Sequence, residues 1–311
     1  MSQPRIVMVG SSMMDLIAYV PRLPTRAETI EGTEFRTGFG GKGSNQAVMA
    51  ARLGARVAAV VRLGRDSFGD DTLGNYRDQG IDVEHVEIVD GYASGVAPIA
   101  VESSTGDNSI IVVPGANATL GAADVDRAAA TIASADVVLC QLETPLDATR
   151  RAFEVAREAR TVTTILNPAP AAEVPDDVLH LTDVFVPNEV EAAFYLETDV
   201  RSPDAALDAA RSLQRRGPRS VVVTLGDRGA VFVDHEGHGA HVPTPTVRAV
   251  DSTGAGDAFV GALGTFLGTR EPLEDACRKA CAIAARSVTK HGTQTSFPYR
   301  AEVEDLISDG G

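Results

Sequence analysis

The sequence predicts an α/β protein: a doubly wound, three-layer αβα arrangement in which helices cover both faces of a mostly parallel sheet, with a small β-sheet lid. From residue 124 onward, helix-like and strand-like segments alternate strictly, which implies parallel strands joined by helices. The first apolar run, residues 6–9, ends in Gly10, as a buried strand does at the sheet edge where ligands bind. Two segments, at about 13–40 and 92–114, alternate like exposed strands and predict the lid. We expect a single domain over residues 1–311.

Glycine, proline and turn residues mark the ends of the individual elements. Pro21, Pro24 and Gly32 break the pattern of residues 16–39, which favours short strands over a helix. Thr105-Gly106-Asp107-Asn108 predicts a hairpin turn. The expected strands cover residues 6–9, 57–61, 95–101, 109–113, 137–142, 161–166, 184–186 and 220–224. The expected helices cover residues 46–53, 70–79, 124–133, 146–159, a stretch after Pro203, 258–263 and 273–289.

Composition excludes several classes of function. The chain carries 43 acidic and 28 basic residues, a net charge of −15, so we expect no binding to nucleic acid or to an anionic membrane through a basic patch. No apolar run approaches the roughly 20 residues that span a bilayer, and the start of the chain is too strand-like for a secretory signal. These features predict a cytoplasmic protein, and 44% apolar residues in 311 support a sizeable core.

The thiols and lysines are few. Cys140, Cys277 and Cys281 form no C-x-x-C pair, and we expect buried or inert thiols. Lysine is rare, and the richness in Arg, Ala and Asp fits either a GC-rich genome or a salt-rich habitat.

The segment around Asp257 carries the strongest chemical signal. Asp251-Ser252-Thr253-Gly254-Ala255-Gly256-Asp257 leads directly into an apolar run that predicts a helix. Small residues before a helix can aim several backbone N–H groups at one point, where the helix dipole also favours an anion. A carboxylate there suits a base that takes a proton from a hydroxyl while the N–H groups stabilise the transferred group. A glycine-rich loop with an acidic capping residue would show the same pattern.

A second signal lies far upstream, in Gly40-Gly41-Lys42-Gly43-Ser44-Asn45. The two stretches match G-G-K-G-x-N and D-[ST]-x-G-A-G-D, so the chain resembles the ribokinase-like (PfkB) family of sugar kinases. Shorter stretches at 141–145, 167–170, 187–189 and 224–226 extend the resemblance over nearly the whole chain. It implies a sheet between helices with a β lid over the sugar, and a homodimer formed through that lid. It also implies transfer of the γ-phosphoryl of Mg-ATP to a sugar hydroxyl, at O5 for D-ribose.

The resemblance also assigns roles to residues. Asp257 would be the catalytic base, with the backbone of Gly254, Ala255 and Gly256 as the anion hole, because phosphoryl transfer asks mainly for positioning and neutralised charge. Sugar contacts carry over to Met13, Asp15, Gly41, Lys42, Gly43, Asn45, Glu143 and Asp257. Nucleotide contacts carry over to Asn188, Glu191, Thr224, Gly226, Asp227, Gly229, Gly256 and Cys281, with Glu191 at the position that orders Mg²⁺ and phosphate. An activating K⁺ would lie among Asp251, Thr253, Ser287, Lys290, Gly292 and Ser296, mostly on backbone carbonyls.

Two positions depart from the family pattern. Met13 stands where bacterial members have a sugar-contacting Asn, although eukaryotic members resemble this chain in having Met. Cys281 stands where an adenine-flanking His or Asn is often found.

Other functions fit weaker signals. Residues 38–43 satisfy G-x-G-x-x-G and would suit a nicotinamide-binding oxidoreductase, but they do not close the first strand. His235, His238 and His241 have metal-like spacing, yet they flank a hairpin tip, where such side chains are usually solvated. Within the family, the substrate could also be 2-deoxyribose or fructose; a nucleoside is disfavoured by 5% aromatic content, which leaves few platforms for a base.

Overall fold

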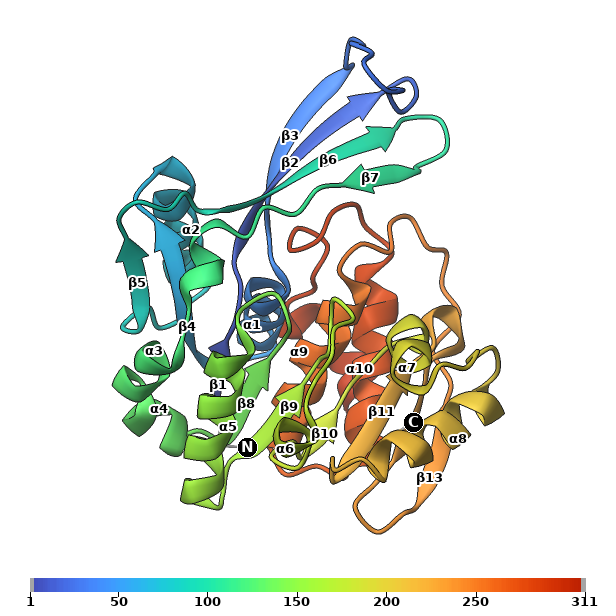
Figure 1. Cartoon of the computed structure of the whole chain (residues 1–311). Helices are drawn as coiled ribbons and strands as arrows, with labels where there is room; N and C mark the ends of the chain where they lie inside the picture. Colours follow the sequence, from blue (N-terminus) through green and yellow to red (C-terminus); the bar gives the residue numbers. More distant parts are fainter. Residues whose placement is uncertain (1–2, 309–311) are drawn as a thin grey trace.

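The structure is a computed structural model that describes residues 3–308, so the first two and the last three residues of the predicted domain lie outside it. A nine-stranded sheet forms the centre (Figure 1). In spatial order its strands are β13 (Gly239–Val242), β12 (Ala230–Val233), β11 (Ser220–Thr224), β10 (Val184–Phe185), β9 (Thr163–Leu166), β8 (Val137–Cys140), β1 (Arg5–Val9), β4 (Arg56–Gly64) and β5 (Val86–Val89). The strands from β11 to β5 are parallel, and β12 and β13 extend the edge as an antiparallel hairpin.

Alternation along the strands separates two cores. In β1, Ile6 and Met8 enter one apolar core, whereas Val7 and Val9 enter the other, as the two-residue period of a strand requires. The first core is covered by α1 (Lys42–Arg52), α2 (Ser67–Asp78), α9 (Ala255–Gly268), α10 (Leu273–Ser287) and α11 (Glu304–Ile307). The second is covered by α3 (Ala122–Arg127), α4 (Ala129–Ala133), α5 (Leu146–Ala159), α6 (Asp176–Leu179), α7 (Glu189–Leu196) and α8 (Pro203–Gln214). The predicted three-layer α/β fold is confirmed.

A second sheet projects from the top of the molecule in Figure 1. Its strand order is β3 (Glu34–Gly40), β2 (Met13–Val20), β6 (Gly95–Glu102) and β7 (Asn108–Ile110). β2 pairs in parallel with β6 and antiparallel with β3. All four strands fall within the segments predicted as a lid, at about 13–40 and 92–114, so we call this sheet the lid sheet.

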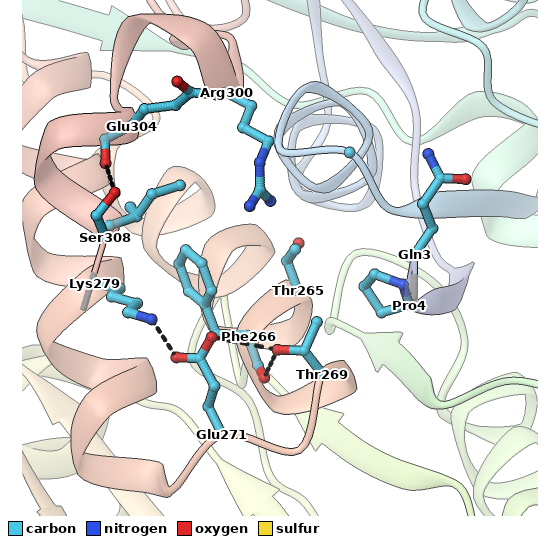
Figure 2. A pocket seen from close by; sticks show the side chains of 12 residues that line it. Gln3, Pro4, Thr265, Phe266, Thr269, Glu271, Lys279, Arg300, Glu304 and Ser308 are labelled. Atoms are coloured by element: carbon cyan, nitrogen blue, oxygen red, sulfur yellow. Dashed lines mark hydrogen bonds and ion pairs between the residues drawn. The ribbon is translucent and has the colours of Figure 1, made fainter. Parts of the chain in front are cut away.

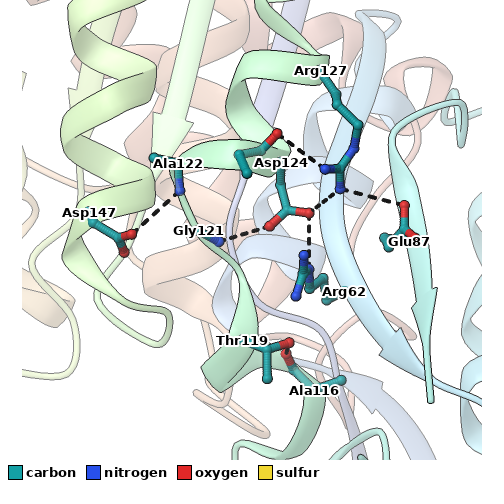
Figure 3. Close-up of polar contacts among 10 residues, drawn as sticks. Arg62, Glu87, Ala116, Thr119, Gly121, Ala122, Asp124, Arg127 and Asp147 are labelled. Carbon is teal, nitrogen blue, oxygen red and sulfur yellow. Dashed lines mark hydrogen bonds and ion pairs between the residues drawn. The ribbon is translucent and has the colours of Figure 1, made fainter.

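A buried carboxylate, that of Asp124, fixes a helix to the β5 edge of the main sheet (Figure 3). Asp124 in α3 accepts from the Gly121 backbone N–H at 2.8 Å and from Arg62 Nε at 2.9 Å. Arg127 also contacts Asp124 and lies 3.5 Å from Glu87 in β5. The capping interaction and the two guanidinium groups together tie α3 to β4 and β5.

The helix predicted for residues 46–53 begins earlier than expected, at Lys42. Glycine-rich sequence concealed its first turn, because glycine is a weak helix former. Gly43 is needed here for packing: a side-chain carbon at this position would lie 2.8 Å from the Ser11 carbonyl oxygen. The G-G-K-G-x-N stretch therefore opens a helix and packs against the end of β1.

Other elements also differ from the predictions. The helix predicted for residues 124–133 is divided into α3 and α4, with Ala128 between them. The short elements β5, α6 and α7 were not predicted, although Asn188-x-x-Glu191 is a capping-box pattern that signals the start of α7.

Candidate active site

Asp257 lies in the first turn of α9, at the edge where the parallel strands end, and is 7% exposed. It borders a cavity of about 200 Å³, and the residues that line this cavity come from distant parts of the chain. The cavity is lined by Lys42, Asn167, Ala169, Val186, Asn188, Glu191, Thr224, Ser252, Gly254, Ala255, Gly256, Asp257 and Val260. The structure thus brings together the base, the glycine loop, the motif lysine and part of the nucleotide set that the resemblance implied.

Two amide side chains from α1 hold the Asp257 carboxylate. Asn45 Nδ2 donates to Oδ2 at 2.9 Å, and Gln46 Nε2 donates to Oδ1 at 3.2 Å. Because each oxygen of a carboxylate has two lone pairs, both oxygens keep capacity to accept a further proton or hydrogen bond. Gln46 was not predicted as a site residue; its only sequence signal is its place directly after Asn45 in the motif.

The backbone before Asp257 forms a turn whose geometry suits the binding of an anion. Gly254 caps α9 with φ of 78°, and a side-chain carbon there would collide with Thr293, so this position requires glycine. The Ala255 N–H bonds the Ser252 carbonyl at 3.2 Å, which leaves the N–H groups of Gly256 and Asp257 in the unpaired first turn. An added carbon at Gly256 would meet nothing within 4 Å. Gly256 therefore keeps open space at a helix N-terminus, where an anion binds well.

Lys42 balances the negative charge of the site. Asp257, and with weaker effect Glu143 and Glu191, raise the pKa of Lys42 against the opposing effect of burial. The Lys42 backbone N–H also donates to Glu143 Oε2 at 2.8 Å, and Ser11 Oγ donates to the same oxygen at 2.5 Å. Burial raises the pKa of Glu143 despite these bonds.

Asp15, in β2 of the lid sheet, lies close enough to Glu143 and Asp257 for their charges to act on it. Burial, and then the charges of Glu143 and Asp257, raise its pKa from the ordinary 3.8 to about 7. In β2 it pairs with Gly38 of β3, and a side chain on Gly40 would collide with its carboxylate. Neither Asp15 nor Glu143 lines the cavity at Asp257. Carboxyl groups that converge from different elements suit a ligand with several hydroxyls, because each hydroxyl can donate to one of them.

The remaining predicted sugar residues lie close by. Met13 is buried at the start of β2, directly opposite Gly40 in the ladder. Gly41 has φ of 85°, and an added side-chain carbon would lie 2.8 Å from the Met13 backbone nitrogen. The two glycines therefore let β2 and the start of α1 approach closely.

On the predicted nucleotide side, Asn188 and Glu191 bind each other. Asn188 Oδ1 accepts from the Glu191 N–H and Glu191 Oε2 accepts from the Asn188 N–H, each at 2.8 Å. Burial raises the pKa of Glu191. Asn188 also forms a backbone bridge with Thr224 at the end of β11, so the carboxyl ends of two neighbouring strands are joined.

The loop after Thr224 is shaped by glycines. Gly226 opens a 3₁₀ turn (Gly226–Arg228) with φ of 59°, and Gly229 leaves it with φ of 89°. Asp227 within this turn is exposed. A side chain on Gly229 would lie 2.7 Å from the Thr244 nitrogen, so the loop packs tightly on the segment that follows β13. None of Gly226, Asp227 and Gly229 lines the cavity around Asp257.

Cys281 also lies outside that cavity. It is 2% exposed in α10, with Sγ 4.0 Å from the Val242 carbonyl oxygen, and burial raises its pKa to about 12. A nucleotide contact by Cys281 stays a prediction. All three cysteines are buried and unpaired, as expected.

The predicted cation residues occupy two segments that Asp251 connects. Asp251 Oδ1 accepts from the Thr253 N–H at 2.9 Å, and Oδ2 accepts from the Gly292 N–H at 2.8 Å. The hydroxyls of Ser287 and Ser296 bond nearby carbonyls, and Lys290 Nζ bonds Glu302. Since the lysine ammonium points to Glu302, only the Lys290 carbonyl is suited to bind a cation.

The structure gives less support to the other candidate sites. Within residues 3–308 no group of three or more His, Cys, Asp or Glu is arranged to hold a metal ion, and His241 instead contacts the Arg228 carbonyl. Gly38 and Gly40 of the G-x-G-x-x-G stretch belong to the lid strand β3, so the stretch does not follow β1 as dinucleotide binding would require. Among the described residues, no helix combines the length and apolar character needed to cross a membrane.

A larger cavity, of about 550 Å³, lies at the far end of the strands (Figure 2). It is bordered by Pro4, just before β1, and by Gly54, just before β4. Lys279 Nζ contacts Glu271 Oε2 at 2.8 Å within it and lies 5.4 Å from the centre of the Phe266 ring. Ligands of parallel sheets bind at the opposite, carboxyl ends of the strands, so the smaller cavity at Asp257 is the candidate active site.

Comparisons with known proteins agree with this geometry. The chain is 43% identical to mouse ribokinase over 302 residues, covering 96% of this chain and 93% of the mouse protein. It is 39% identical to a deoxyribokinase of Salmonella typhimurium over 304 residues, covering 97% and 98%. The structure of Arabidopsis thaliana ribokinase complexed with ribose and ATP superimposes with a TM-score of 0.90, at 28% identity, over 99% of this chain and 100% of that one. The model of the pfkB family of carbohydrate kinases matches residues 3–300, and the chain belongs to that family.

Proposed function

We propose that this kinase transfers the γ-phosphoryl of Mg-ATP to the 5-hydroxyl of D-ribose. The observation that carries the proposal is the juxtaposition of Asp257, the open N-terminus of α9 and Lys42 at one cavity. The names of the mouse and Arabidopsis relatives support ribose and ATP. The Salmonella relative makes 2-deoxyribose the second candidate.

The chemistry follows from these groups. Asp257 accepts the proton of the sugar hydroxyl as its oxygen bonds to the γ-phosphorus, and the bond to the β-phosphate oxygen breaks to release ADP. The Gly256 and Asp257 N–H groups and the Lys42 ammonium stabilise charge on the transferred group. Asp15, Asn45 and Glu143, with the backbone at Gly41 and Gly43, hold the sugar.

The same proposal includes two metal ions. Mg²⁺ accompanies the nucleotide and neutralises phosphate charge, with Asn188 and Glu191 at the cavity edge to order it. K⁺ would be held between the segments that Asp251 connects, on oxygens contributed by the six residues predicted above. Hard cations prefer oxygen ligands, and the hydroxyls and carbonyls of these segments fit that preference.

We further propose that two copies associate through the lid sheet in the cytoplasm. Phe35, Ile110, Ile111 and Val112 are each at least 50% exposed on or beside its edge strands, an apolar patch typical of an interface. Three unpaired thiols and the use of ATP fit a reducing compartment.

The test is ADP release from Mg-ATP with D-ribose, 2-deoxyribose and fructose in parallel, each with K⁺ and with a bulky organic cation. Ribose-dependent release that K⁺ stimulates supports the proposal. Release with another sugar alone would keep the mechanism and change the substrate. If ADP release with ribose is the same with K⁺ and with the organic cation, the proposed cation site is wrong.

A further inference from the structure

We propose that Asn75 and Gln294, which lie outside the cavity, are positioning residues that fix the catalytic base through a one-way chain of side-chain hydrogen bonds. Asn75 Nδ2 in α2 donates to Gln294 Oε1 at 3.0 Å. Gln294 Nε2 donates to Asn45 Oδ1 at 3.0 Å, and Asn45 Nδ2 donates to Asp257 Oδ2 at 2.9 Å. We call this series the amide chain. The proposal rests on the role of Asp257 as base.

The direction of every bond in the amide chain is set by Asp257. A carboxylate can only accept, so Asn45 must present its NH₂ to Asp257 and its oxygen to Gln294. Gln294 must then donate to Asn45 and accept from Asn75. Each amide has one orientation that satisfies both neighbours, and a reversal at Asn75 would turn the Asn45 oxygen toward the carboxylate.

Because the inner part of the amide chain is buried, reversing the direction of its hydrogen bonds costs free energy. Asn45 and Gln294 are each 5% exposed, so neither can exchange a lost partner for water at low cost. Gln294 Nε2 also donates to Ser44 Oγ at 3.1 Å, which holds it on the first turn of α1.

A second chain holds the other carboxylate oxygen. Gln141 Nε2 donates to Gln46 Oε1 at 2.6 Å, and Gln46 Nε2 donates to Asp257 Oδ1 and to Asn167 Oδ1. Asn167 Nδ2 donates to the Val186 carbonyl, which again only accepts. Both oxygens of the base are therefore oriented by groups that do not titrate near neutral pH.

The amide chain passes through the segment that contains the predicted cation residues. Gln294 lies between Gly292 and Ser296, and Arg52 Nη1 at the end of α1 holds its carbonyl at 2.5 Å and that of Phe297 at 2.8 Å. The same segment is tied by Gly292 to Asp251, and through Asp251 to Thr253 before α9. Gln294 is thus placed to transmit a displacement of this segment to the base.

The decisive variant is Asn75→Asp, which keeps the shape of the side chain but can no longer donate when ionised. It reverses Gln294 and then Asn45, so the Asn45 oxygen faces Asp257. We expect kcat to fall about 10-fold and the carboxyl-carbon NMR resonance of Asp257 to shift, because an oxygen replaces an N–H donor beside the carboxylate. Asn75→Ala should lower kcat by only about 2-fold and leave that resonance in place. Gly74→Asp is the control for charge, because a side chain there would meet nothing within 4 Å; it should behave like the unmodified enzyme.

The carboxyl-carbon resonance of Asp257 is observed by NMR at one pH, with the signal assigned by its loss in Asp257→Asn. This readout needs no turnover, so it decides the inference even if none of the tested sugars is phosphorylated, the result that would sink the proposed function. The pair of variants Gln294→Glu and Gln294→Met repeats the comparison one residue closer to the base. We expect kcat to fall more in Gln294→Glu than in Gln294→Met. Equal effects of Asn75→Asp and Asn75→Ala, or an equal shift of the Asp257 resonance in Gly74→Asp, would overturn the inference.

Discussion

As the proposed base, Asp257 has two requirements to meet: it must accept a proton from the sugar hydroxyl, and it must stay fixed while phosphate charge approaches. Its two amide donors supply the second requirement. Asp257→Asn keeps the volume of the side chain but removes the proton acceptor, so we expect turnover to fall by about 10³-fold. Thermal unfolding should show a native-like transition, and near-normal turnover would remove Asp257 as the base.

Asp15 is a residue whose function costs stability. Its folded-state pKa of about 7 lies above the ordinary 3.8, so the folded protein binds more protons than the unfolded chain between these values. Its contribution to stability is therefore present below pH 4 and is lost as the pH rises through 7. At pH 8, Asp15→Asn should raise the free energy of unfolding by up to about 4 kcal/mol.

The same substitution should weaken sugar binding. An ionised carboxylate accepts hydrogen bonds from two hydroxyls, which an Asn side chain cannot match. Sugar affinity of the unmodified enzyme should thus decline as the pH falls below 7, and that dependence should be weaker in Asp15→Asn. Calorimetric titration across pH 6 to 8 measures the sugar affinity of both proteins. Denaturant titration measures their stability, and a stability gain from Asp15→Asn that is no larger at pH 8 than at pH 5 would contradict the assignment.

At the scale of one element, two glycines at the N-terminus of α9 have different roles: Gly254 is needed for folding, and we expect Gly256 to be needed for binding. Gly256 has helical backbone geometry and an open side-chain position, so Gly256→Ala should stabilise α9 by about 0.5–1 kcal/mol. Its methyl group would occupy the open space of the proposed anion site, and we expect kcat/KM to fall by about 10²-fold. Gly254→Ala is the matched variant: its φ of 78° and the contact with Thr293 predict a loss of stability of about 1–2 kcal/mol or more. Denaturant titration with steady-state kinetics distinguishes the two glycines, and a stabilised, fully active Gly256→Ala would argue against the anion site.

Elements also show where sequence reasoning succeeds and where it stops. The buried strands, such as the apolar run from Ile6 to Val9, and the Asp257 loop were predicted because their patterns are local. Gln46 and Gln294 were not, because a lone glutamine has no local signature and acquires its role only when α1, α9 and the segment after α10 meet. α7 was missed for another reason: its capping box was present, but the eight-residue helix is short and its hydrophobic periodicity weak.

At the scale of the whole molecule, the lid sheet is the part that the main core does not stabilise. Its outer strands β3 and β7 are mostly exposed, and its apolar side chains Phe35 and Ile111 are 64% and 62% exposed. In an interface with two-fold symmetry each substitution acts twice, so Ile111→Glu should raise the dimer dissociation constant by at least 100-fold. Leu306→Glu, on an exposed site away from the lid, is the control.

Sedimentation velocity over a range of protein concentrations measures this equilibrium. Because Asp15 is carried by β2 of the same sheet, a lid released from its partner should also hold the sugar less tightly. We therefore expect KM for the sugar to rise in Ile111→Glu, while KM for ATP, whose predicted contacts lie on the main sheet, stays within about 2-fold. A protein that sediments as a monomer before substitution would remove the dimer proposal and leave the Asp257 site unaffected.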